Sequence, residues 1–285
     1  MRRGVKRENT ERQLAPNLNL VSEFLDCYIS DQTIEPLRAN MSPEERFVRE
    51  LEHLRQDSDA AAQFLYAWLA FHAFAYGNRS TIIAINKNAL FWNTVLGSLQ
   101  TALFISLGRI FDKDPRNHCI NRLLREATQN PQIFSRVALA SRKRQQSPGA
   151  LWIRSYAKEA YLPTANDFRR LSRYVANKRK VYERAYENIR HQVFAHGGAS
   201  SKEKKDALFN GTQLGELQRL VLSLRAFHQA MWQLYFNGNK PMIKIGKYSI
   251  NSMSRDISKL SSTAPIEQLV FAQTCGALGS YVAGA

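Results

Sequence analysis

The segment from Arg190 to His196 gathers two histidines and an arginine within seven residues, directly before two glycines. A histidine with a near-neutral pKa can take a proton from a 2′-hydroxyl of RNA or give one to the leaving oxygen. An arginine can hold a phosphate through two parallel hydrogen bonds and stabilise the charge that develops in the transition state. His196 is therefore the candidate for proton transfer and Arg190 the candidate phosphate clamp.

This chemistry needs no metal ion, because the 2′-hydroxyl of RNA already lies beside the phosphate that it attacks. The sequence has no cluster of Asp, Glu and His residues at ligand spacing. We therefore expect no metal site and no cofactor.

The spacing of Arg190 and His196 raises a geometric problem. Six residues of continuous α-helix turn through about 600°, so the two side chains would point about 120° apart and lie ~9 Å apart along the axis. Two chains related by a twofold axis could instead bring two such segments together at one interface. An active enzyme is therefore expected to be a homodimer.

The same residues also allow a purely structural interpretation. A histidine before two glycines can bond the last carbonyls of a helix, and Arg190 can pair with Glu187 or Glu183 on the preceding turns.

The helix that carries these residues is strongly basic, and so is the whole chain, with a net charge of +16. Such an excess favours polyanionic partners, nucleic acid first and an acidic membrane surface second. The candidate RNA contacts on this helix are Lys178, Arg179, Lys180 and Arg184. The run Arg142-Lys143-Arg144 lies in a stretch, 141–149, that is expected to be an exposed basic connection.

Composition places the chain among proteins of a reducing compartment, here the cytoplasm. Its three widely spaced cysteines form neither a disulfide framework nor a zinc pattern. The basic N-terminus lacks the apolar stretch of a secretory signal. The most apolar window, Ala60–Gly77, includes Gln63, His72 and several aromatic residues, so it is expected to be a buried helix and no membrane association is predicted.

Apolar spacings of three and four residues predict an all-α fold, an elongated bundle of four or more long helices with small terminal additions. The expected helices cover residues 42–56, 57–76, about 81 or 87 to 111, 117–128, 166–196 and 212–236. Residues 1–40 are expected to form a basic arm with a short helix, residues 41–237 the helical domain, and residues 238–285 an extension. Within that extension, residues 242–250 alternate enough to allow a small hairpin, and residues 254–285 could form one or two short helices.

Several polar residues favour structural roles. Arg109 and Asp112 are expected to form a partly buried ion pair near the site, with a phosphate contact by Arg109 as the alternative. His72 and His228 are expected to be core or boundary residues, and His118 a surface loop or cap residue. The aromatic group Tyr66, Trp68, Phe71 and Phe74 is expected to be core rather than a surface on which bases stack.

The segment Arg190-His191-Gln192-Val193-Phe194-Ala195-His196-Gly197 resembles the signature of the HEPN superfamily (higher eukaryote and prokaryote nucleotide-binding), especially its abortive-infection branch. The upstream segment from Phe91 to Asp112 is similar to an earlier long helix of that branch. The resemblance covers roughly residues 45–235.

The resemblance implies a helical bundle that dimerises, with the Arg and His of both chains meeting at the interface. Many members are metal-independent ribonucleases, often toxins or phage-defence effectors, that leave a cyclic phosphate. Carried over by position, Arg190 and His196 are the catalytic pair, and His191 occupies the polar position beside the arginine. Some members are binding or scaffold proteins, so a non-catalytic RNA-binding HEPN protein is the alternative. An antitoxin or regulatory partner is also possible.

Overall fold

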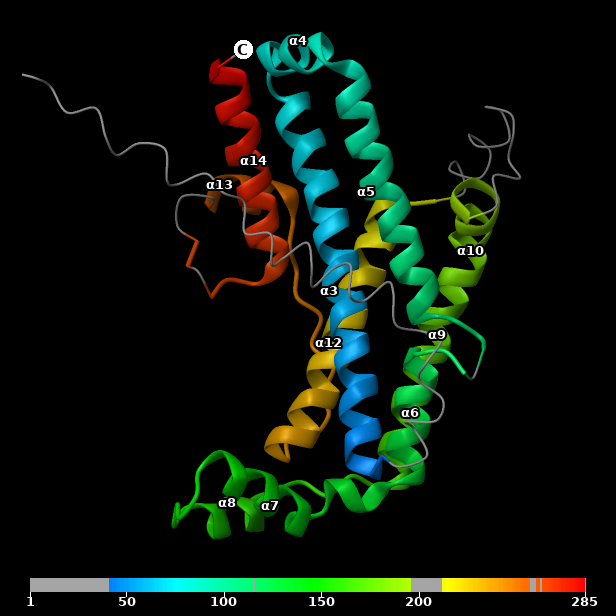
Figure 1. The fold of residues 1–285 in the computed structure, drawn as a ribbon, viewed down its shortest axis with the longest axis vertical. Coiled ribbons are helices and arrows are strands. Elements are labelled where there is room, and N and C mark those ends of the chain that lie inside the picture. The colour runs from blue at the N-terminus through cyan, green and yellow to red at the C-terminus, as the bar shows by residue number, and fades with distance from the viewer. Residues whose placement is uncertain (1–40, 115, 196–211, 257–259, 262, 285) are drawn as a thin grey trace, which may run out of the picture. The chain divides into compact units, whose positions relative to one another are not determined.

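The computed structural model describes residues 41–114, 116–195, 212–256, 260–261 and 263–284, and every regular element among them is a helix (Figure 1). The chain divides into two compact units, Met1–Ser42 and Pro43–Ala285, and the second contains all of these helices. The expected basic arm and short helix of residues 1–40 lie outside the described residues.

The long helices of this unit are α3 (Pro43–Tyr76), α5 (Ala89–Ile110), α9 (Ala165–Ala185), α12 (Leu214–Asn237) and α14 (Ile266–Gly284). Shorter helices connect them: α4 (Arg79–Lys87), α6 (Ile120–Gln129), η1 (Pro131–Phe134), α7 (Arg136–Gln146), α8 (Ile153–Glu159), α10 (Glu187–Ile189), η2 (Arg190–Ala195) and α13 (Ile250–Asp256). The all-α bundle expected from the apolar spacing is confirmed.

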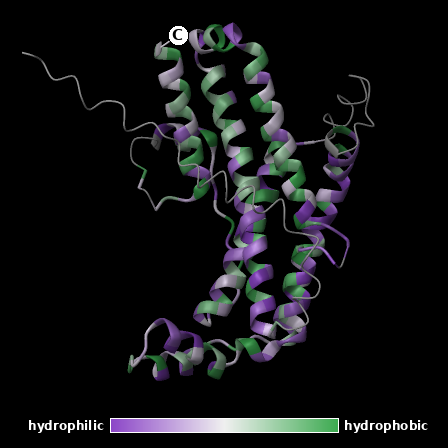
Figure 2. Ribbon diagram, viewed as in Figure 1, coloured by the Kyte–Doolittle hydropathy of each residue, from purple (hydrophilic) through white to green (hydrophobic). Residues whose placement is uncertain are grey.

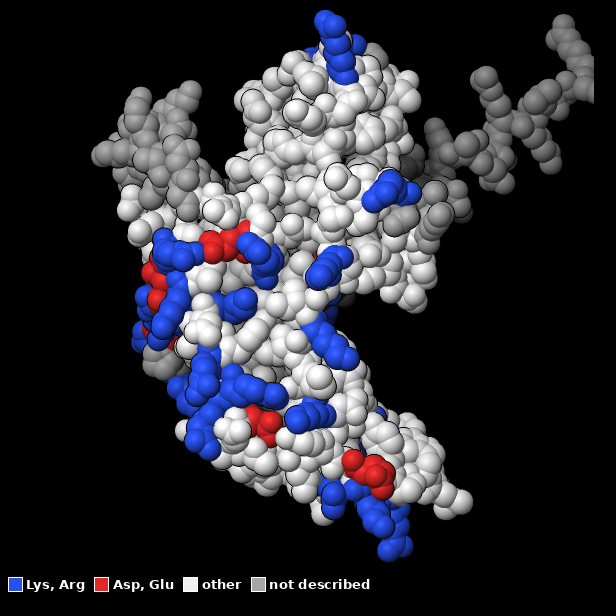
Figure 3. Space-filling view, turned by 180° about the vertical axis from the view of Figure 1, so that it is seen from behind, with Lys and Arg blue, Asp and Glu red and all other residues white. Residues whose placement is uncertain are grey.

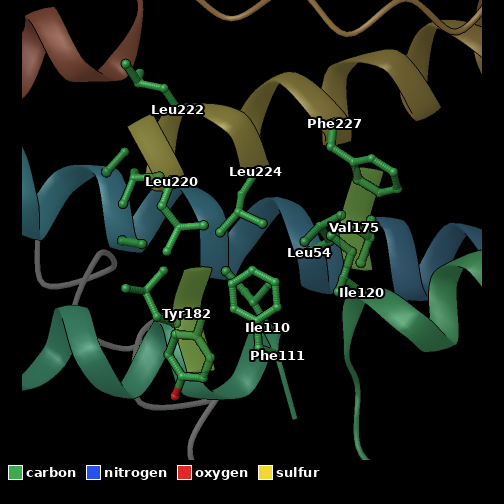
Figure 4. Packing of buried hydrophobic residues seen from close by; sticks show 14 of the residues in the cluster. Leu54, Ile110, Phe111, Ile120, Val175, Tyr182, Leu220, Leu222, Leu224 and Phe227 are labelled. Carbon is green, nitrogen blue, oxygen red and sulfur yellow. The ribbon is translucent and has the colours of Figure 1, made fainter. Parts of the chain in front are cut away.

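Helix α3 is the centre of the unit, because α5, α6, α12 and α14 all pack against it (Figure 1). The hydrophobic core lies where α3, α5, α9 and α12 meet. Figure 4 shows Tyr182 of α9, Ile110 of α5 and Leu224 of α12 converging there. Residues of Ala60–Gly77 supply much of this core, including Leu65, Tyr66 and Leu69, so the prediction of a buried helix is correct.

The expected break at residues 57–59 is wrong, since α3 runs through these polar residues without interruption. Each of them has a partner that keeps it from ending the helix. The hydroxyl of Ser58 donates to the carbonyl of Arg55, Asp57 pairs with Arg109, and Asp59 pairs with Arg225. Two of those partners lie far away in the sequence, so no local pattern could reveal them.

The expected exposed connection at 141–149 is wrong for residues 141–146, because helix α7 continues to Gln146 and buries Arg142; residues 147–149 do form a connection. The guanidinium of Arg142 lies 3.9 Å from the ring of Tyr235. It donates to the carbonyls of Ile133 and Tyr235 at 2.9 and 2.8 Å and pairs with Glu44 at 2.7 Å. Arg142 therefore joins the ends of α3, α7 and α12. These acceptors replace the water molecules that the buried guanidinium has lost.

The expected hairpin at 242–250 is absent; no strand is found there. The segment is instead an irregular connection that follows the bundle. The side chain of Gln218 donates to the carbonyl of Tyr248 at 2.6 Å, and Arg170 donates to the carbonyl of Pro241 at 2.9 Å. Bonds to the helices thus satisfy backbone groups that a hairpin would have paired with each other.

Helix α5 is apolar along its whole length but buried only in its second half. Residues 89–102 include no buried side chain, and Leu90 is 83% exposed. Figure 2 shows hydrophobic residues continuing along this uncovered half. By length and composition α5 could cross a membrane, with 22% of its apolar window buried, but a single helix of this kind is weak evidence for a membrane span.

Candidate functional site

The candidate motif begins after a break in the basic helix. Helix α9 starts at Ala165 with a capping box, in which Thr164 and Asp167 bond each other's backbone, and ends at Ala185. Tyr186 leaves the helical conformation, with φ −126° and ψ −23°. Its ring lies in the core and its hydroxyl donates to the carbonyl of Gln213 at 3.3 Å. The single helix expected over 166–196 is therefore interrupted, because a tertiary contact fixes Tyr186.

The motif itself, Arg190–Ala195, is a π-helix. Its wider turn closes hydrogen bonds between residues five apart, and such turns often occur at functional sites. The 120° separation expected for a continuous α-helix does not apply to this geometry. His196, the candidate for proton transfer, lies outside the described residues, whereas His191 is described and half-buried.

Arg190 lies against the last turn of α5, in a space that a glycine leaves open. A Cβ on Gly108 would come within 2.1 Å of the Arg190 Nε, 2.5 Å of its Cδ and 2.8 Å of its Cζ. Real Cβ atoms essentially never approach other heavy atoms below 3.0 Å. The lack of a side chain at position 108 therefore permits the observed position of the guanidinium.

Two buried polar atoms at this place have no partner among the described residues. They are the Nε of Arg190 and the hydroxyl of Tyr182. Burial raises the pKa of Tyr182 to about 12, and the nearby charge of Arg190 partly counters that effect. The Tyr182 ring stacks on Phe111 at 5.0 Å. Leaving donors unpaired in this way costs stability, so an acceptor such as a phosphate oxygen would be favourable here.

The alternative in which Arg190 pairs with Glu183 or Glu187 does not occur in the structure. Lys113, just after α5, holds both carboxylates, at 3.1 Å and 3.0 Å. Within the described part of the chain Arg190 has no ion pair. Its positive charge thus remains uncompensated there.

Arg109 and Asp112 do not form the ion pair expected of them. Arg109 pairs with Asp57 of α3, with an N–O distance of 2.5 Å. The carboxylate of Asp112 accepts hydrogen bonds from the backbone of Asp114 and the side chain of Asn117. Arg109 thus braces α5 against α3, and Asp112 shapes the following turn.

The four candidate RNA contacts on α9 have different surroundings, since successive helical residues point about 100° apart. Arg179 donates to the carbonyl of Phe111 at 2.7 Å, and Arg184 pairs with Glu216 at 2.5 Å. Lys178 lies over the ring of Tyr174 at 5.4 Å, and burial lowers its pKa. Lys180 is exposed. Figure 3 shows Lys and Arg side chains gathered over the flank of the unit where α9 lies.

The other histidines have structural surroundings. His228 is half-buried, and burial lowers its pKa to about 4. His72 is not the core or boundary residue expected: it is exposed, and its ring lies 4.1 Å from the ring of Trp68. His118 is not the surface residue expected: it bonds the buried carboxylate of Glu50 at 2.9 Å, which also pairs with Arg122 at 2.8 Å.

Sequence reasoning missed three residues at the motif, Gly108, Lys113 and Tyr182. Tyr182 could have been found, because it lies eight residues, or about two turns, before Arg190. No local signal distinguishes Gly108 or Lys113. In the described ranges, no group of three His, Cys, Asp or Glu side chains is placed to hold a metal ion.

The family model HEPN_AbiU2, described as AbiU2, matches residues 44–258 of the chain. The chain belongs to the AbiU2 family of HEPN proteins. The match extends from the first turn of α3 beyond α13. No curated protein and no solved structure matches the chain.

Proposed function

We propose that this AbiU2-family protein is a metal-independent RNA endonuclease that acts as a toxin or phage-defence effector in the cytoplasm. The observation that carries the proposal is the guanidinium of Arg190, held against Gly108 with its Nε buried and unpartnered among the described residues. A fixed cation at a HEPN motif, without an ion pair to any described residue, is suited to a phosphate whose negative charge grows during the reaction.

In the proposed reaction the 2′-oxygen of one nucleotide attacks the adjacent phosphorus, and the bond from phosphorus to the 5′-oxygen of the next nucleotide breaks. His196 takes the proton of the 2′-hydroxyl, and a second His196, from the paired subunit, protonates the leaving 5′-oxygen. Arg190 binds the non-bridging oxygens of the phosphate. The products are a 2′,3′-cyclic phosphate and a free 5′-hydroxyl. His191, beside the arginine, supports the site.

The uncovered half of α5 supports the pairing of two subunits. It exposes Leu90 and Phe91 at 83% and 59%, and no Asp or Glu occurs in the sequence between Asp59 and Asp112. An apolar surface of this kind is typical of a protein interface. This exposed surface and Gly108 belong to the same helix, so a second copy bound there would contact the helix that positions Arg190.

The test is to incubate the purified protein with RNA in EDTA, beside the variants Arg190→Ala and His196→Ala. We expect cleavage by the native protein and a loss of about 10²–10³ in rate for Arg190→Ala, as for removal of one oxyanion donor. Cleavage that both variants retain would remove these residues from the mechanism. RNA binding without cleavage would favour the alternative, a non-catalytic RNA-binding HEPN protein.

The pairing has a separate test by light scattering. The native protein is expected to be a dimer, and Phe91→Glu is expected to give monomers that do not cleave RNA. The exposed residue Val137 on α7 offers a control, since Val137→Glu also adds a charge to an exposed apolar position. Native protein that is monomeric at the concentrations where it cleaves would contradict the paired mechanism.

A defence role predicts an effect in cells. Expression of the native chain should arrest growth, and expression of Arg190→Ala should not. Relief of that arrest by a protein encoded nearby would identify an antitoxin or regulatory partner.

A further inference from the structure

A groove between α6 and α9 lies apart from the Arg190 motif on the same basic helix. It has a volume of about 500 Å³ and is open to solvent along one side. Its lining from α6 is Asn121, Leu124, Arg125, Thr128 and Gln129, and from α9 it is Ser172, Ala176 and Arg179. The lining thus contains two arginines, several small polar groups and no carboxylate.

Backbone carbonyls, and not an acidic side chain, hold Arg179 in this groove. Arg179 donates to the carbonyl of Phe111 at 2.7 Å and that of Asp112 at 3.4 Å, and neither acceptor carries a formal charge. Its positive charge is therefore fixed in position but not neutralised. Arg125 is exposed on the opposite wall.

Further cations flank the groove on α9. Arg173 and Lys180 are seven residues apart, so they lie about two turns apart on nearly the same face, next to the lining residues Ser172 and Arg179. Both side chains are exposed, and neither has an ion pair with a described residue. The carboxylate of Glu183, three residues after Lys180, is held by Lys113 at 3.1 Å.

We propose that the α6–α9 groove binds the sugar–phosphate backbone of a single RNA strand and leads that strand to Arg190. The inference rests on the proposed ribonuclease function, whose substrate it places on the molecule. The groove offers fixed and mobile cations for phosphates, and amide and hydroxyl groups that can bond sugar hydroxyls. Arg179 precedes Arg190 by eleven residues, about 16 Å along a helix, so a strand of a few nucleotides could span the two.

The experiment measures binding of single-stranded RNA by fluorescence anisotropy over a range of salt concentrations. Arg190→Ala serves as the background so that the RNA stays intact. The groove variant is Arg173→Glu with Lys180→Glu. The control is Arg154→Glu with Lys158→Glu, which changes two exposed cations that lie four residues apart within α8. On the Arg190→Ala background, whose net charge is one below the native +16, each double variant lowers the net charge from +15 to +11, since each reversal removes two charges.

Loss of two phosphate contacts should reduce the salt slope of log K by about 1.4, from about 0.7 per contact on single strands. We expect this reduction for the groove variant and an unchanged slope for the control. Equal slopes for the two double variants would overturn the proposal, because RNA would then respond to overall charge alone.

A second pair of variants tests the groove itself at an exposed lining residue. Ala176→Glu and Ala176→Gln add side chains of nearly equal size, but only the first adds a negative charge. Affinity for RNA should fall at least tenfold more for Ala176→Glu than for Ala176→Gln. Equal affinities would overturn the assignment of phosphates to this groove.

Cleavage by chains with native Arg190 separates this inference from the proposed function. Cleavage that is unaffected by Arg173→Glu with Lys180→Glu would overturn the role of the groove in RNA binding, but it would leave the proposed ribonuclease function intact. Groove-dependent binding by a protein that never cleaves RNA would overturn the ribonuclease and leave the groove as an RNA-binding surface.

Discussion

Replacing Gly108 by alanine would put a methyl group where the Arg190 side chain lies. The added Cβ would be 2.1 Å from the Nε and 2.5 Å from the Cδ of Arg190, so the arginine must move by about 1 Å or more to restore ordinary contact. The displaced atoms belong to a flexible side chain and not to the backbone. The cost in stability should therefore be at the low end of the about 1–3 kcal/mol typical of overpacking.

A gain offsets part of this cost, because alanine is favoured over glycine in a helix by about 0.5–1 kcal/mol. The net change in the free energy of unfolding should thus be small. Activity should respond much more, since a phosphate clamp displaced by about 1 Å can lose about 10²-fold in rate. We expect Gly108→Ala to lower the rate of RNA cleavage about 10²-fold while leaving the thermal midpoint within a few degrees.

Gly276 is the matched control, because it lies within another helix, α14, and a Cβ there meets nothing within 4 Å. Gly276→Ala should cleave RNA at the native rate. Adding Gly108→Ala to Arg190→Ala should cost nothing more, if the glycine acts only through the arginine. Native cleavage by Gly108→Ala, or a further loss in the double variant, would refute this account of the site.

Three further predictions concern stability and charge. Burial lowers the pKa of His228 to about 4, below the value near 6.5 in the unfolded chain. Protonation therefore favours the unfolded chain, and the free energy of unfolding falls by up to about 3 kcal/mol as the pH drops from about 6.5 to 4. Urea unfolding at pH 7 and pH 4.5 should show His228→Gln losing less stability than the native protein, and parallel losses would contradict the assignment. Arg142→Met should lower the free energy of unfolding by about 2–4 kcal/mol, because it strips the buried carbonyls of Ile133 and Tyr235 of a donor, and a cost under 1 kcal/mol would show that another group replaces it. Lys113→Ala breaks only exposed ion pairs and should change the free energy of unfolding by less than about 1 kcal/mol. It also frees the carboxylates of Glu183 and Glu187 near Arg190, so it should slow RNA cleavage, most at low salt. An unchanged cleavage rate would show that these carboxylates do not influence the site.

Local spacing was enough to predict most helices. The stripe of apolar residues from Phe91 to Leu107 predicted α5, and the one from Leu214 to Leu234 predicted α12. Failures came where a polar residue has a distant partner. The sequence predicted that a helix starts at Asp57 and Asp59. Ion pairs with Arg109 and Arg225 instead keep these two aspartates within the continuous helix α3. Tyr186 read as an ordinary helical residue, yet its packing in the core ends α9.

The sequence by itself determined the helical class, the position of the motif and the excess of positive charge, because these depend on residue type and on spacing within one or two turns. It also carried the resemblance that the AbiU2 match confirms over residues 44–258. Only the tertiary structure decided which arginines are engaged. Arg109, Arg142 and Arg179 are bound by acceptors from other helices, whereas Arg190 occupies the space that Gly108 leaves open. That choice depends on which groups meet when helices pack, over separations of up to 166 residues, as between Asp59 and Arg225, and no local pattern encodes it.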